Sequence, residues 1–213
     1  MIDTVLFDLD GTLCDTNELI IETVDYIFKN FIKEHKLTRD EYIKFIGPTL
    51  YESFGWYVDD KDYVDFLVKE YRKKNIELHD SYVKPFDGAY ELLKSLKNEG
   101  YQLGVVSSKL NEMVRRGLRV SGIDSVFDVI VGLDDVKNHK PHEEPILKAL
   151  SQFDCVKGAI YVGDHQNDIL AAKNASIMSC GLLYSLHKDS LLKANADYYV
   201  SSLLELKEVL KHV

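Results

Sequence analysis

Residues 2–13 read IDTVLFDLDGTL, an apolar run that passes directly into an acidic turn containing glycine. The run from Ile2 to Leu9 is rich in residues that favour a strand. It is continuously apolar, which is typical of a parallel strand covered on both faces. Asp8 and Asp10 flank Leu9, so their side chains leave the strand in the same direction. We therefore expect a first strand that brings two carboxylates to one edge of a parallel sheet.

The segment that follows this turn has helical periodicity. Asp15 with Glu18 three residues later resembles a helix start. Apolar residues then recur at helical spacing over residues 20–31, and a further helical pattern runs over residues 60–78. We predict an all-helical cap over residues 15–82, inserted after the first strand.

From residue 83 onward, short apolar runs alternate with helical patterns. Strands are expected at residues 102–107, 127–131, 159–163 and 177–182. A last helix is expected to be capped by Ser202 and Glu205. Alternation of this kind indicates βαβ units and helices on both faces of the sheet. The predicted fold class is α/β: residues 1–14 and 83–213 form a Rossmann-like parallel-sheet core, and residues 15–82 form the cap.

The composition excludes several classes of function. The 213 residues include 26 Lys and Arg against 35 Asp and Glu, a net charge of −9, which argues against a nucleic-acid partner. Apolar runs stay well short of the roughly 18 residues of a membrane span, and the N-terminus lacks a basic leader region. Cys14, Cys155 and Cys180 form neither a disulfide framework nor a zinc motif. We expect a cytoplasmic protein with no membrane partner.

Polar side chains also follow the later strands. Ser107 and Ser108 end the second strand, Lys140 follows the third after a loop, and Asp164 ends the fourth, with Asp168 four residues on. Taken singly, each has an ordinary interpretation as a turn, cap or surface residue. Taken together they indicate a site, because ligands bind beyond the carboxyl ends of parallel strands. Carboxylates gathered there repel one another unless a cation such as Mg²⁺, which prefers oxygen ligands, joins them.

These residues carry a family resemblance that covers the whole chain. The segments Asp8-Leu9-Asp10-Gly11-Thr12, Lys140-Pro141 and Gly163-Asp164-x-x-x-Asp168, with Ser107, resemble the motifs of the haloacid dehalogenase-like (HAD) hydrolase superfamily. Phe45-Ile46-Gly47-Pro48, Lys84-Pro85-Phe86-Asp87-Gly88 and Leu133-Asp134-Asp135-Val136 are similar to the phosphoglycolate phosphatase and bacterial pyrophosphatase group. The resemblance implies a Mg²⁺-dependent hydrolase that removes phosphate from a small metabolite, phosphoglycolate or inorganic pyrophosphate, through an aspartyl-phosphate.

The resemblance also implies a role for each motif residue. Asp8 is the expected nucleophile and Asp10 the general acid and then base, and Ser107 and Lys140 complete the catalytic set. The implied Mg²⁺ ligands are Asp8, the backbone carbonyl of Asp10 and Asp164, with Asp168 acting mainly from behind them. The implied phosphate-binding residues are Gly11, Thr12, Ser107, Lys140 and Ser108, the last through an N–H at a helix start.

The sequence departs from the group's pattern in small ways. Ser107 stands where Thr is common, which keeps the hydroxyl, and Glu143 replaces the second proline of Lys-Pro-x-Pro. His165 lies beside Asp164, but Mg²⁺ rarely takes imidazole, so a metal role is not expected. The aromatic residues of the helical segment are expected to form its core; they are Phe28, Phe31, Tyr42, Phe45 and Trp56.

Other interpretations stay open at this point. A sugar phosphomutase of the same superfamily uses the same two aspartates, and a binding protein that has lost catalysis would keep the fold. The Gly47-Pro48 turn either reaches the substrate or simply separates two helices. The sequence does not decide the substrate or the oligomeric state.

Overall fold

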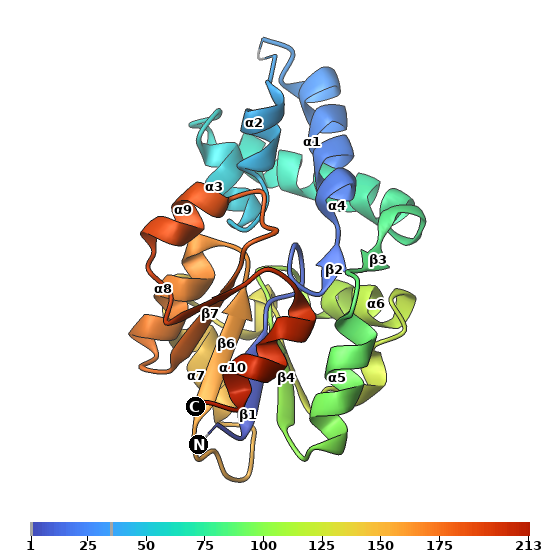
Figure 1. Ribbon diagram of the computed structural model, residues 1–213. Helices are drawn as coiled ribbons and strands as arrows, with labels where there is room; N and C mark the ends of the chain where they lie inside the picture. The colour runs from blue at the N-terminus through green and yellow to red at the C-terminus, as the bar shows by residue number, and fades with distance from the viewer. Residues whose placement is uncertain (1, 35) are drawn as a thin grey trace.

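The computed structural model describes residues 2–34 and 36–213, and within them a six-stranded sheet forms the centre of the molecule (Figure 1). The strand order is β5-β4-β1-β6-β7-β8, and every neighbouring pair is parallel. The strands are β1 (Thr4–Phe7), β4 (Gln102–Val106), β5 (Val129–Val131), β6 (Ala159–Gly163), β7 (Met178–Leu182) and β8 (Tyr198–Val200). Strand β1 therefore lies between β4 and β6, which places its carboxyl end at the middle of the edge.

Helices cover both faces of this sheet, as the alternating pattern predicted. They are α5 (Ala89–Asn98), α6 (Asn111–Val120), α7 (Glu144–Leu150), α8 (Gln166–Asn174), α9 (Lys188–Lys193) and α10 (Leu206–Leu210). Val5 and Phe7 pack in one apolar cluster with residues of α5, α6 and α10. Leu6 points the opposite way and packs with residues of α7 and α8. The continuously apolar run of β1 thus has its expected cause, because both faces of the strand are buried. The predicted α/β fold class is confirmed.

The described residues of the segment 16–82 are helical apart from their connecting loops, and they lie together beyond one end of the sheet (Figure 1). The helices are α1 (Asn17–Phe31), α2 (Arg39–Ile43), α3 (Leu50–Gly55) and α4 (Lys61–Tyr82). They enclose an apolar cluster of their own, which includes Phe28, Phe45 and Phe54. The chain enters and leaves along β2 (Cys14–Asp15) and β3 (Lys84–Pro85), which pair antiparallel. The division into a core and a cap at residues 14/15 and 82/83 stays a prediction; below, "cap" means the segment 15–82.

Two helix starts differ from expectation. Asp15 belongs to β2, so α1 begins at Asn17, and the Asp15 carboxylate only accepts a hydrogen bond from the Asn17 N–H at 3.2 Å. The side chain of Ser202 makes no capping hydrogen bond, and Leu203–Glu205 form a 3-10 turn before α10. In both places the sequence signature is present, but the backbone takes another local structure first.

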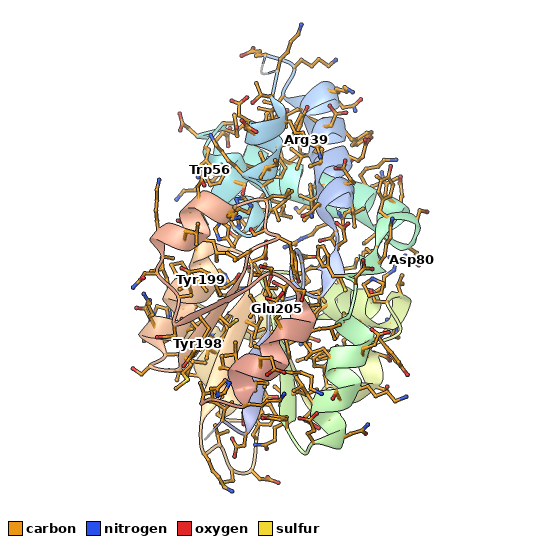
Figure 2. All side chains as sticks on the ribbon, viewed as in Figure 1. Arg39, Trp56, Asp80, Tyr198, Tyr199 and Glu205 are labelled. Carbon is orange, nitrogen blue, oxygen red and sulfur yellow. The ribbon has the colours of Figure 1, made fainter. Side chains whose placement is uncertain are left out.

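Other elements and exposures were not foreseen. Helix α9 and strand β8 are short, and β8 extends the sheet beyond β7. Trp56 was expected in the cap core, yet it is 48 % exposed and lies at the periphery of the cap (Figure 2). Its ring only contacts the edge of the cluster, with its centroid 6.1 Å from that of Phe45.

Membrane-spanning helices and disulfide bonds were not expected from the sequence. Among the described residues, no helix combines the length and apolar character that crossing a membrane requires. Cys14, Cys155 and Cys180 are free thiols.

Candidate active site

Lys140 lies at the centre of a buried polar cluster at the carboxyl edge of the sheet. Its ammonium group donates to Asp8 Oδ1 at 2.8 Å, Asp168 Oδ1 at 2.7 Å and the hydroxyl of Tyr161 at 2.9 Å. Its surroundings leave the residue only 7 % exposed. The ordinary interpretation of Lys140 as a surface lysine is therefore wrong, because its ammonium group is buried and paired with two carboxylates.

The two central strands bring three carboxylates together. Asp8 directly follows β1, Asp164 directly follows β6, and Asp168 lies in the first turn of α8. One oxygen of each lies within 4.8 Å of the others, and all three residues are buried. Asp168 uses both of its oxygens, since Oδ1 binds Lys140 and Oδ2 accepts the N–H of His165 at 2.9 Å. Asp168 is thus positioned to orient its neighbours.

The electrostatics of this cluster are unbalanced, because three carboxylates share one ammonium group. Burial raises the pKa of Asp8 to about 7; Lys140 opposes this shift, and Asp168 and Asp10 add to it. Burial, together with Asp168 and Asp8, raises the pKa of Asp164 well above its ordinary value. Burial alone would lower the pKa of Lys140, but Asp168 and Asp8 outweigh it, so this pKa is raised. Like charges held this close favour the entry of a further cation.

The donor set fits Mg²⁺. Among the described residues, Asp8 Oδ1 accepts only from Lys140 at 2.8 Å, and Asp164 accepts only from hydroxyl donors, Thr12 at 3.2 Å and Ser185 at 3.4 Å. Gly11 has a φ of +80°, and a Cβ there would lie 2.5 Å from Asp164 Oδ2. Only glycine lets this turn close over the carboxylate. Buried carboxylate oxygens of this kind are what Mg²⁺ prefers, whereas imidazole is not.

Asp10 lies apart from the Lys140 cluster and has its own partner. Its carboxylate Oδ1 accepts a hydrogen bond from Lys109 Nζ at 2.7 Å, and both side chains are mostly buried. Lys109 comes from the loop after β4, so two neighbouring strand ends supply the pair. The two aspartates of the first motif thus have separate lysine partners and separate environments, which lets them perform different steps.

The residues expected to bind phosphate have different surroundings. Ser107 follows β4, and its hydroxyl accepts the N–H of Lys109 at 3.2 Å. Helix α6 begins only at Asn111, so the predicted helix-start N–H of Ser108 is wrong; Ser108 belongs to the preceding loop. The hydroxyl of Thr12 is fully buried and donates to Asp164, which ties it to the carboxylate cluster.

A cavity of about 260 Å³ lies between this sheet edge and the cap. Asp8, Asp10 and Ser107 line one part of it, and Gly47 and Pro48 of the cap line another. The Gly47-Pro48 turn therefore reaches the same space as the catalytic candidates. That this turn contacts the substrate stays a prediction.

His165 has two structural contacts, one with the Gly47 turn and one with the start of α8. Its φ is +105°, and a Cβ there would lie 2.7 Å from His165 Cγ, so this turn rests directly on the imidazole ring. Nδ1 of His165 accepts the N–H of Asn167 at 3.1 Å, which makes the histidine the N-terminal cap of α8. Burial lowers the pKa of His165 to about 4, so the ring is neutral near pH 7. These contacts occupy His165 without a metal.

Sequence reasoning missed Tyr161 altogether. This residue lies inside the apolar strand β6, two positions before Gly163, where an aromatic side chain is read as core. It is fully buried, yet its hydroxyl donates to the Val106 carbonyl at 2.7 Å and accepts from Lys140. Tyr161 therefore fixes the position of Lys140, and only the neighbouring motif could have signalled it.

Comparisons with known proteins agree on one relationship. The family model described as haloacid dehalogenase-like hydrolase matches residues 5–182. The chain is 38 % identical over 212 residues to a protein of Listeria monocytogenes serotype 4b (strain CLIP80459) named Pyrophosphatase PpaX, covering 99 % of this chain and 97 % of the relative. It is 40 % identical over 210 residues to a Pyrophosphatase PpaX of Halalkalibacterium halodurans, covering 98 % and 96 %. A solved structure described as a predicted phosphatase from Clostridium acetobutylicum is 31 % identical over the full length of both chains, with a TM-score of 0.89.

Proposed function

Because the chain belongs to the haloacid dehalogenase-like hydrolases, as its motifs predicted, we propose that it is a Mg²⁺-dependent phosphatase or pyrophosphatase in which Asp8 is the nucleophile. The observation that carries this proposal is the buried contact of 2.8 Å between Lys140 Nζ and Asp8 Oδ1 at the wall of the cavity. This contact leaves the second oxygen of Asp8 without a partner among the described residues. A fixed carboxylate with one available oxygen is suited to attack phosphorus.

The proposed reaction has two displacements. In the first, Asp8 Oδ2 bonds to phosphorus as the bond from phosphorus to the leaving oxygen breaks, and Asp10 gives that oxygen a proton. In the second, a water oxygen attacks the aspartyl-phosphate, Asp10 takes the proton from this water, and the Asp8 carboxylate is released with inorganic phosphate. Lys140 holds Asp8 in place and offsets negative charge on the transferring group, and Ser107 donates to its oxygens.

Asp8, Asp164 and the backbone carbonyl of Asp10 would hold Mg²⁺, with Asp168 fixing Lys140 and the start of α8 behind them. When bound, the cation supplies positive charge that draws in the phosphoryl oxygens. The hydrogen bond from Thr12 to Asp164 Oδ1 orients this carboxylate, which supports ligand binding.

The relatives named Pyrophosphatase PpaX make inorganic pyrophosphate the first substrate to test, and phosphoglycolate is the second. We place the reaction in the cytoplasm, where free thiols such as that of the exposed Cys155 stay reduced. The test is phosphate release from both compounds, and from hexose phosphates, with Mg²⁺ and with EDTA. Release that requires Mg²⁺ is expected. No release from any compound, or release that EDTA does not reduce, would contradict the proposal.

The Gly47-Pro48 turn is proposed to contact the non-phosphoryl end of the substrate, since both residues line the cavity. Thr49 is a poor place for the test, because its hydroxyl caps α3 by accepting the Glu52 N–H at 3.2 Å. Pro48→Ala leaves that cap intact. A change in the ranking of substrates supports contact with substrate, and a uniform change over all substrates supports a turn that only separates two helices.

A further inference from the structure

The cavity extends well beyond the space that one phosphoryl group occupies. Its volume is about 260 Å³, and its lining reaches from the sheet edge to α4 of the cap. Away from Asp8 and Asp10, its lining is largely apolar. The apolar lining residues include Ile20, Phe45, Leu50, Tyr71, Ile76 and Met113. The leaving half of the substrate must therefore occupy a space bounded largely by apolar surface.

Arg72 is a cation of this lining that has no partner among the described residues. Two other cations of the cavity are already neutralised, Lys109 by Asp10 at 2.7 Å and Arg116 by Asp80 at 2.9 Å. Arg72 lines the same cavity and is half-buried, yet no described residue forms an ion pair or a side-chain hydrogen bond with it. Glu112 at the start of α6 also lines the cavity, but it is exposed and makes no ion pair with Arg72. Arg72 thus keeps a full positive charge available to a ligand.

The stretch of α4 that carries Arg72 is anchored by its buried neighbours. Tyr71 and Asn75 of α4 are buried on either side of it along the chain, and the Asn75 amide donates to the hydroxyls of Thr23 at 3.2 Å and Tyr71 at 3.4 Å. Residues three apart on a helix share a face, so Arg72 and Asn75 face the same space, and both line the cavity. A guanidinium is a planar fork of donors that matches a carboxylate or a phosphate.

We propose that Arg72 binds a second acidic group on the leaving half of the substrate, and that the enzyme therefore selects phosphates whose leaving group is itself negatively charged. The inference rests on the proposed function, since it assumes that Asp8, which lines the same cavity, attacks the phosphoryl group. Pyrophosphate and phosphoglycolate both belong to this substrate class, with a phosphate and a carboxylate respectively as the second group. Simple alkyl phosphates do not.

The test compares Arg72→Gln with a matched control on the same helix, Lys73→Gln, which removes one exposed positive charge outside the cavity. Two substrates of nearly equal size are used, phosphoglycolate and 2-hydroxyethyl phosphate, with pyrophosphate as a third. In Arg72→Gln, kcat/KM should fall about 10- to 100-fold for phosphoglycolate and pyrophosphate, the size expected for a hydrogen bond between charged groups. It should fall less than about 3-fold for 2-hydroxyethyl phosphate. The acidic substrate with the larger loss identifies the group that Arg72 holds.

Binding of an unreactive analogue tests the role of Arg72 independently of catalysis. Calorimetry with 3-phosphonopropionate, which carries a phosphonate and a carboxylate, should show weaker binding to Arg72→Gln than to wild type, and equal binding to Lys73→Gln. Propylphosphonate, which lacks the carboxylate, should not distinguish the three proteins. Equal losses for acidic and neutral compounds would overturn the role of Arg72. Failure of the proposed function is separate: it would appear as absence of Mg²⁺-dependent phosphate release, whatever the analogue does.

Discussion

The sheet edge and the cap bury opposite kinds of side chain. At the sheet edge, three carboxylates and one ammonium group lie within the protein, with Asp8 at 6 % and Asp164 at 3 % exposure. In the cap, the buried cluster is apolar and rich in aromatic rings, such as the edge-to-face pair Phe28 and Phe45 at 5.8 Å. Burying charge costs stability, whereas burying apolar surface gains it. The difference teaches that the sheet edge is shaped by its chemistry, and the cap by packing and by what it encloses.

The largest effect that this comparison predicts is at Asp8. Asp8→Asn should lower kcat by several orders of magnitude, because the amide removes the nucleophile and one proposed Mg²⁺ ligand at nearly constant volume. Its free energy of unfolding should not fall, since one of three crowded carboxylates becomes neutral. Phosphate release and thermal unfolding measure the two quantities. More than about one per cent of wild-type activity would show that Asp8 is not the covalent nucleophile.

A smaller and substrate-dependent effect is expected at Asp10, whose carboxylate is paired with Lys109 and not with Lys140. Asp10→Asn should slow the reaction by about 10²–10⁴-fold, the usual contribution of proton transfer. The loss should be smaller for p-nitrophenyl phosphate, which has a good leaving group, than for an alkyl phosphate. Parallel measurements of kcat/KM decide the matter, and equal losses on the two substrates would refute the general-acid role.

The next prediction tests whether the hydrogen bond between Lys140 and Tyr161 contributes to catalysis. Tyr161→Phe keeps the ring of this fully buried residue but leaves Lys140 and the Val106 carbonyl without the hydroxyl. We expect kcat to fall about 10-fold with little change in KM, and a loss of about 1–3 kcal/mol in the free energy of unfolding. Tyr198→Phe on β8 is the control, because no described residue is hydrogen-bonded to that hydroxyl. If both variants behave alike, Tyr161 serves the core only.

The smallest effect concerns pH and the junction of the cap with the core. Burial lowers the pKa of His79 on α4 below 6.5, Lys109 and Arg116 lower it further, and Asp80 at 2.8 Å opposes them. The unfolded chain therefore binds this proton more readily, so the contribution of His79 to stability is lost as pH falls from about 6.5 through the lower folded pKa.

His79→Gln should reduce this decline between about pH 7 and pH 5, whereas the exposed His142→Gln should leave it unchanged. His165 and His187 act in the same direction as His79, whereas Asp8, with its pKa raised to about 7, acts in the opposite direction, so the result is the difference in slope between the variant and wild type. Chemical unfolding across this range provides the measurement. An unaltered slope in His79→Gln would show that His79 is not a source of the pH dependence.

Much of the sheet edge was predictable because it depends on one geometrical rule. Parallel strands end at a common edge, so Asp8, Ser107 and Asp164 could be brought together from their places after apolar runs. The burial of Lys140 could not be read from composition, since a lysine in a loop is usually solvated; only the motif pointed to it. Ser108 was misplaced because Lys109 and Leu110 come between the strand and α6.

The remaining errors have local physical causes. Strand β8 is a run of three residues, too short for its period to be recognised. Tyr161 has the apolar neighbours of a core residue, and its hydroxyl bonds to Lys140 and to the Val106 carbonyl, which lie 21 and 55 positions away in the sequence. Arg72 lies on a helix rich in charge, where a basic residue is normally assigned to solvent. The cap as a helical insert was visible in the pattern, whereas the cavity that it forms with the sheet edge depends on three-dimensional packing.

The most direct test of the central claim is a crystal structure of the protein with Mg²⁺ and tetrafluoroaluminate, a mimic of the transferring phosphoryl group. The account predicts that the anion lies against the Asp8 carboxylate, in contact with Ser107 and Lys140, with Mg²⁺ between Asp8 and Asp164. An anion bound elsewhere in the cavity, away from Asp8, would contradict the claim that the sheet edge performs the chemistry.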